Sequence, residues 1–264
     1  MIENLFVLIG KPFVLFYTSL EKFGEFIIFQ LKLIPLYFKF FKRLREVFKQ
    51  MERIGVQTFW LIMLTATFTG MVEAIQLYQG FKNFGAEGFM GYTIFVSLTK
   101  ELGPVFGSLM VVSRAVSSMA AELGTMRVTE QIDALDVLSI DSREYLIIPK
   151  VIATTLSLPI LVAIFDGVGN LSAYFVSVYA LDINPIMYQN TIIKYIHFSD
   201  IFSGIVKAFV FGFLISAIGT YIGYFASKGA RGVGLATTKA VVYASIVIFG
   251  ANYFLSSIFL FMGW

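Results

Sequence analysis

The sequence contains no cysteine and a single histidine, His197, among its 264 residues. The absence of cysteine excludes disulfides, thiolate zinc sites and iron–sulfur ligation. His197 has no second imidazole near it in the sequence with which to share a metal ion. We therefore expect no metal site and no cofactor in this chain.

Charged residues are scarce as well. They make up 14% of the chain, against 58% hydrophobic residues. A soluble domain has about a quarter charged residues and under half apolar ones. This composition excludes a soluble enzyme, a disordered chain and a nucleic-acid-binding module. The lipid bilayer is the expected solvent.

Catalytic motifs are also missing. The chain has no GxxxxGK[ST] phosphate-binding loop, no HExxH and no GxSxG. These motifs bring together the groups that hydrolyse nucleotides, peptides or esters. We therefore expect no catalytic residues, and any ATP hydrolysis must belong to a partner subunit.

What the sequence does contain is long apolar runs. A helix that crosses the bilayer needs about 20 apolar residues. Five segments satisfy this requirement and predict an all-α membrane protein: 55–80, 91–121, 145–169, 201–226 and 240–262. Asp166 and Asn170 predict the far end of the third span, so that 170–180 would lie at the membrane surface or re-enter the bilayer.

Residues 1–54 have a different pattern from the transmembrane domain predicted over 55–264. Their apolar clusters are interrupted by charges, and basic residues are concentrated between Lys39 and Arg53. Mixed apolar and basic faces at helical spacing are typical of a helix lying in the membrane interface. The alternative is an ordinary first span over 5–35.

The distribution of lysine and arginine predicts the orientation. With five spans and the N-terminus inside, the inner segments 1–54, 122–144 and 227–239 hold nine, two and three basic residues. The outer segments 81–90 and 181–200 hold one each. Since basic residues are enriched in cytoplasmic segments, we expect a cytoplasmic N-terminus and a periplasmic C-terminus.

Several ionisable residues fall within the predicted spans, where each costs about 2.5–3.5 kcal/mol at the membrane centre. Glu73, Lys100, Glu101 and Lys207 come from three spans and all fall in the outer half of the membrane. Both signs of charge are present, so we predict that these residues face a shared cavity on a substrate pathway. The alternative is that they only hold helices together. Arg114 is expected to extend to the inner interface.

Glycine pairs in two spans favour close helix packing. Gly103 with Gly107, and Gly219 with Gly223, have the GxxxG spacing that lets membrane helices approach. This spacing fits either a helical bundle or a dimer.

The segment 122–144 is the longest polar connection, with six acidic and two basic residues. Val128, Ile132, Leu135 and Ser139 recur at helical spacing and predict an amphipathic helix over about 124–140. An apolar seam beside an acidic stripe fits a groove on a partner protein. The alternative is a solvated connecting helix.

The run from Glu101 to Val105, followed by Arg114 and then by the whole stretch 121–135, closely resembles the MlaE (YrbE) family. Members of this family are permease subunits of ABC transporters that work with MCE proteins to move phospholipids and related lipids. Val116 and Lys150 depart from the family's usual glycine and arginine.

The resemblance implies a homodimer in the bacterial inner membrane, with a cytoplasmic ABC ATPase, a periplasmic MCE-domain protein and a phospholipid substrate. It leaves room for a small cytoplasmic STAS-type accessory protein, and no nucleic acid is involved. It makes 124–140 a coupling helix that meets the ATPase, with these residues as candidate contacts: Glu122, Gly124, Thr125, Met126, Arg127, Val128, Glu130, Gln131, Asp133 and Leu135.

The alternative function is a secondary transporter or channel that uses Glu101 and Lys207 as a proton or ion site. Such transporters are often built from internal repeats, and the sequence shows none. The lipid transporter is therefore the leading hypothesis.

Overall fold

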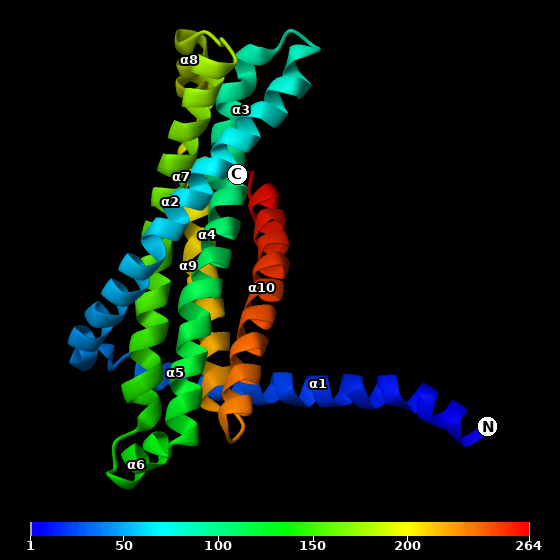
Figure 1. Cartoon of the computed structure of the whole chain (residues 1–264), viewed down its shortest axis with the longest axis vertical. Coiled ribbons are helices and arrows are strands. Elements are labelled where there is room, and N and C mark those ends of the chain that lie inside the picture. Colours follow the sequence, from blue (N-terminus) through cyan, green and yellow to red (C-terminus); the bar gives the residue numbers. More distant parts are fainter. Residues whose placement is uncertain (1, 264) are drawn as a thin grey trace.

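The computed structural model describes residues 2–263, with the side chains of 2–16, 19, 40 and 42 left aside. Over this range the chain forms an upright bundle of long helices with one helix lying across its base (Figure 1). The elements are α1 (Ile2–Tyr37), η1 (Phe40–Arg43), α2 (Leu44–Lys82), η2 (Glu87–Phe89), α3 (Met90–Ser97), η3 (Leu98–Leu102), α4 (Gly103–Val111), η4 (Val112–Val116), α5 (Ser117–Val128), α6 (Gln131–Val137), η5 (Arg143–Ile147), α7 (Ile148–Phe175), η6 (Val176–Ala180), α8 (Pro185–Tyr195), α9 (Phe198–Tyr224) and α10 (Ala230–Phe261).

Five helices are long and apolar enough to cross a membrane, which confirms the predicted all-α class and number of spans. They are Leu44–Lys82, Glu87–Val128, Arg143–Ala180, Phe198–Tyr224 and Ala230–Phe261. The second runs through α3, η3, α4, η4 and α5, in which η3 and η4 are π-helical turns. The chain is a multi-pass membrane protein.

The first span begins earlier than the predicted residue 55. Helix α2 starts at Leu44 and continues to Lys82 without a break. Val47, Ile54 and Thr58 are buried at helical spacing, so the basic stretch before residue 55 has an inward face that continues the span.

The helix of the third span does not end at 166–170 as predicted. Helix α7 runs on to Phe175 and is continued by η6 to Ala180, so 170–180 is a continuation of that helix and not a separate element. Asn170 remains helical because its side-chain amide donates to the carbonyl of Asp166, 2.8 Å away. Gly169 packs against α2 at Gly70, where a side chain on Gly70 would overlap the Gly169 backbone. This packing compensates for the low helix propensity of glycine.

Both GxxxG pairs are used inside the bundle. Gly107 of α4 packs on Val162 of α7, and Gly223 of α9 packs on the backbone of Ala120 in α5. Gly219 lies directly against Val116, one of the two positions that depart from the family pattern. These glycines therefore position helices within one chain.

Helix α1 lies across the base of the bundle, beside the ends of α5 and α9 (Figure 1). Its buried residues Phe29, Leu33 and Leu36 join a small apolar cluster with Leu123 and Ile132. Its opposite face exposes a second apolar stripe: Phe23, Ile27, Leu31 and Ile34. A helix with one face on protein and an exposed apolar stripe fits the predicted interfacial position, and α1 is not one of the five spanning helices found among the described residues.

Candidate functional site

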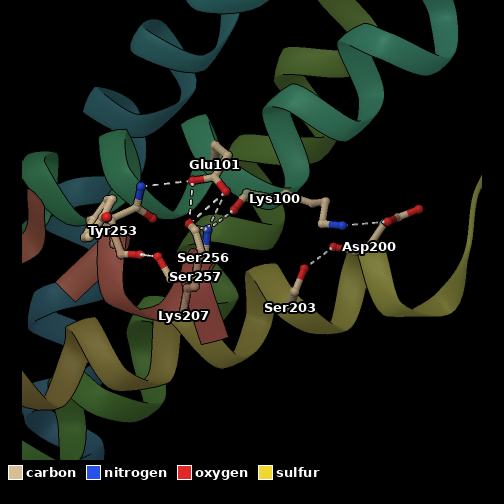
Figure 2. Close-up of polar contacts among 9 residues, drawn as sticks. Lys100, Glu101, Asp200, Ser203, Lys207, Tyr253, Ser256 and Ser257 are labelled. Carbon is tan, nitrogen blue, oxygen red and sulfur yellow. Dashed lines mark hydrogen bonds and ion pairs between the residues drawn. The ribbon is translucent and has the colours of Figure 1, made fainter. Parts of the chain in front are cut away.

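Three of the four predicted pathway residues meet in one ionic cluster, drawn in Figure 2. Lys207 of α9 donates to the carboxylate of Glu101 over 2.7 Å, to the carbonyl of Lys100 over 2.9 Å and to the hydroxyl of Ser256 over 2.8 Å. Its side chain is only 1% exposed. All three protons of the ammonium group therefore have acceptors, which is what a buried lysine requires.

The Glu101 carboxylate is bonded by residues of α9 and α10 and is partly exposed on its remaining side. Besides Lys207, its carboxylate accepts from the Asn252 amide at 2.9 Å and from the Ser256 hydroxyl at 3.0 Å, both on α10. Yet its side chain is 43% exposed. The charges of Glu101 and Lys207 cancel. One face of the Glu101 carboxylate remains accessible from outside the bundle.

Lys100 forms a second ion pair beside the first. Its ammonium group lies 3.0 Å from Asp200, whose side chain is 7% exposed. Asp200 also accepts from the backbone N–H of His197 and so caps the start of α9, where the helix dipole favours a negative charge. His197 thus has a capping role at this helix start.

Glu73 is not part of this cluster. Its carboxylate accepts a hydrogen bond from Ser97 at 2.9 Å, which joins α2 to α3. The structure therefore brings Lys100, Glu101 and Lys207 together and places Glu73 on a separate contact.

A close approach of α9 to η3 makes this geometry possible. Gly204 lies so near Thr99 that a Cβ atom would overlap the Thr99 carbonyl oxygen. Lys207 is three residues further along the same helix, close to one turn. Glycine at 204 therefore lets the Lys207 ammonium group reach the Lys100 carbonyl and the Glu101 carboxylate.

Gly204→Ala is expected to destabilise the folded chain by about 1–3 kcal/mol, because the helices must separate to admit the methyl group. Gly167→Ala in α7 is the matched control, since its Cβ would meet no atom within 4 Å. Thermal unfolding in detergent should show a lower midpoint for the first variant only. Equal midpoints for the two variants would contradict the close-packing argument.

Three cluster members escaped the sequence analysis: Asp200, Asn252 and Ser256. Asn252 and Ser256 stand four residues apart in an apolar span, and this spacing was the available signal. Asp200 lies at the start of α9, where an acidic residue is common as a helix cap and does not by itself indicate an ion pair.

The acidic connection is divided into two helices instead of the single helix predicted over 124–140. Helix α5 continues to Val128, the chain turns at Glu130 with φ of 58°, and α6 covers Gln131–Val137. The turn is stabilised by Arg127, which donates to Asp133 over 2.7 Å and to the Tyr224 carbonyl over 3.0 Å. Burial of Ile132 fixes α6 against the bundle.

The ten candidate coupling residues differ in accessibility. Glu122 and Gly124 face the bundle: Glu122 accepts from both Arg53 and Lys150 at 2.9 Å, and Gly124 packs on Ala226 and Val233. Thr125, Glu130, Gln131 and Asp133 are exposed, while Met126, Arg127, Val128 and Leu135 are half-buried. Lys150, the other departure from the family pattern, is thus the buried partner of Glu122.

The tip of this connection also exposes apolar side chains. Val137 is 84% exposed and Leu138 69% exposed. Burial would raise the pKa of nearby Asp141, but hydrogen bonds and charge from Arg143 outweigh it and lower that pKa. The tip therefore combines the ionised carboxylate of Asp141 with exposed aliphatic groups.

A bundle of five candidate spans with an ionic cluster between them is compatible with the membrane subunit of a transporter. The model of the family "Permease MlaE" matches residues 47–258. The chain belongs to this family. It is an ABC transporter permease and the non-catalytic membrane subunit of such a system.

Relatives cover almost the whole chain. A probable ABC transporter permease protein of Rickettsia bellii is 45% identical over 262 residues, 98% of this chain and 99% of the relative. The intermembrane phospholipid transport system permease protein MlaE of Haemophilus influenzae is 32% identical over 259 residues, 98% of each chain. The chloroplastic protein TRIGALACTOSYLDIACYLGLYCEROL 1 of Arabidopsis thaliana is 41% identical over 217 residues, 81% of this chain and 61% of the relative.

Proposed function

We propose that this permease moves phospholipids or related lipids between the bacterial inner membrane and a periplasmic MCE-domain partner. The observation that carries the proposal is the cluster around Glu101, which places an accessible carboxylate beside a fully bonded lysine inside the membrane. A lipid headgroup needs such polar contacts to leave the interface, because an unpaired polar group in hydrocarbon is costly. The relative from Haemophilus influenzae, named for phospholipid transport, supports the same substrate class.

Energy would come from a separate cytoplasmic ATPase that meets the surface formed by Thr125, Glu130, Gln131, Asp133 and the exposed tip at Val137–Leu138. We name this set the coupling surface. Exposed carboxylates next to aliphatic side chains suit a groove on a partner. Glu122 and Gly124 would act indirectly, by fixing α5 to its neighbours.

The proposed orientation places the coupling surface and α1 on the cytoplasmic side and α8 on the periplasmic side. The basic residues before Arg53 and after Phe225 support it, since they lie at the same end of the bundle as α6. The MCE-domain partner would then meet the α8 end. A permease homodimer would enclose the open face of Glu101, and a small STAS-type accessory would lie with the ATPase.

The family assignment favours this function over an independent secondary transporter. In the structure, the Glu101 and Lys207 side chains neutralise each other and are fixed by α10. A paired site of this kind is better suited to a polar headgroup than to repeated protonation.

The function is tested with Glu101→Lys. This variant should reduce lipid transfer between reconstituted vesicles by at least about tenfold, since it sets two lysines against each other where a paired charge stood. The amount of ATPase that co-purifies should stay unchanged, because the coupling surface lies beyond the far end of the second span, about 40 Å from Glu101.

The proposed function would be contradicted if Glu101→Lys transferred lipid normally, or if the variant lost the ATPase while lipid transfer persisted. Glu73→Lys is the matched control, because Glu73 lies outside the cluster and pairs with no lysine among the described side chains. Point variants are preferable to deletion of the connection, because Gly124 and Ile132 pack into the bundle.

A further inference from the structure

A groove of about 930 Å³ lies at the base of the bundle, away from the ionic cluster. It is bounded by α1, by the segment between Asp136 and Arg143, and by the end of α9. Its floor is aromatic: Phe29 contacts the rings of Tyr221 and Phe225, each at 5.3 Å between centroids. These ring contacts join α1 to the end of α9 beneath the groove.

Three of the six charged residues on the groove lining are held in ion pairs. Arg143 binds Asp141 at 3.1 Å. Arg127 binds Asp133 at 2.7 Å and lies over the ring of Tyr224 at 4.7 Å. These pairs build the wall and need no ligand.

Two charges on α1 are different. Lys32 and Glu25 both line the groove and are exposed, and neither has a hydrogen bond or ion pair among the described side chains. They are seven residues apart, so they lie on one face of the helix about 10.5 Å apart along its axis. Among the described side chains, the groove therefore presents one cation, Lys32, and one anion, Glu25, without a hydrogen-bond or ion-pair partner, while Asp136 on the lining accepts only the backbone N–H of Ser142 at 3.2 Å.

The groove also lies at the depth of lipid headgroups. The exposed apolar stripe of α1, Phe23 to Ile34, requires contact with acyl chains, which places this helix in the interface. Ile28 and Phe225 on the groove lining are 54% and 56% exposed, so the groove has apolar walls next to its charges. A lipid of the surrounding leaflet reaches it without leaving the membrane.

We propose that this groove binds one phospholipid with a zwitterionic, primary-amine headgroup. Lys32 would bind the phosphate and Glu25 the ammonium group, while an acyl chain lies on Ile28 and Phe225. The site is separate from the transport pathway, since Tyr221 is fourteen residues from Lys207, about 21 Å along α9. This lipid site is additional to the proposed function. It rests on the proposed function only for the choice of leaflet, which is the cytoplasmic one.

The test uses the full-length chain in nanodiscs of equal parts phosphatidylethanolamine and phosphatidylglycerol, followed by native mass spectrometry after release into mild detergent. The unmodified chain should retain phosphatidylethanolamine in excess of its share. Lys32→Glu should lower the retained amount about tenfold, the effect of losing one charge-assisted phosphate contact. Lys22→Glu is the matched control, because Lys22 is exposed on α1 but does not line the groove.

Two further variants separate this site from the ionic cluster. Glu101→Gln, which keeps an oxygen acceptor for Lys207, should keep the retained lipid. Glu25→Lys should shift retention toward phosphatidylglycerol, since the groove would then carry two cations. Equal retention by Lys32→Glu and Lys22→Glu would overturn the proposal. So would loss of the lipid in Glu101→Gln alone with an unchanged thermal midpoint, which would assign the lipid to the transport pathway and leave the proposed function intact.

Discussion

Glu101→Leu is expected to lower the free energy of unfolding by about 3–5 kcal/mol, the cost of leaving a buried charge without its partner. The Lys207 side chain is 1% exposed and would keep only two neutral acceptors, the Lys100 carbonyl and the Ser256 hydroxyl. Unfolding of the purified chain by heat or denaturant in a fixed detergent measures the change.

The double variant Glu101→Leu with Lys207→Met should recover most of the loss, because replacing a buried ion pair by apolar groups of similar volume is often neutral. Glu73→Leu is the control and should cost about 1 kcal/mol, since it removes only the hydrogen bond from Ser97. If Glu101→Leu were no more harmful than Glu73→Leu, the ion pair would not be the element that holds these helices together.

Leu138→Asp is expected to reduce co-purification of the ATPase by about thirtyfold, the effect of losing 2 kcal/mol at a central interface residue. The side chain is 69% exposed in the free chain, so a carboxylate there leaves folding nearly unchanged. Pull-down of the ATPase on the tagged permease, with the thermal midpoint measured in parallel, separates lost docking from lost folding.

Ile186→Asp provides the matched control for this interface prediction. Ile186 is 68% exposed on α8, at the opposite end of the bundle, and the chemical change is the same. Full ATPase recovery with Leu138→Asp, or equal loss with Ile186→Asp, would show that the tip at Val137–Leu138 is not part of the coupling surface.

The spans were predictable because they depend on length and hydropathy, which the sequence states directly. Their ends were not, since they depend on partners. Asn170 looked like a terminator, but its amide bonds back to Asp166 and the helix continues. Gly169, equally, is a packing surface for Gly70 and not a break.

The cluster was predictable in half of its members. Lys100, Glu101 and Lys207 stood out because a charge in an apolar run is costly. Asn252 and Ser256 carry no charge, and their role depends on α10 packing beside η3, which no local pattern reports. Their polar spacing in the last span was visible, but its partner was not.

The acidic connection between the second and third spans was also predictable only in part. Its apolar seam was expected to meet a groove on a partner, whereas Ile132 of that seam is buried within this chain. The seam could not predict the turn at Glu130, because that turn is fixed by Arg127 reaching both Asp133 and the distant Tyr224 carbonyl. The inward position of Glu122 likewise depends on its ion pair with Lys150, which is far away in the sequence.

The second span has a mechanical consequence that follows from its continuity. Glu101 and Val128 belong to one unbroken helical column, 27 residues apart or about 40 Å. A hydrogen-bonded helix resists changes in its length, so we expect an axial displacement at the base of this column to move the ionic cluster around Glu101 as well. The π-helical turn η4 lies between the two points and has a wider, less regular hydrogen-bond pattern. The second span is therefore expected to move as a stiff helix, with one more deformable turn near Arg114.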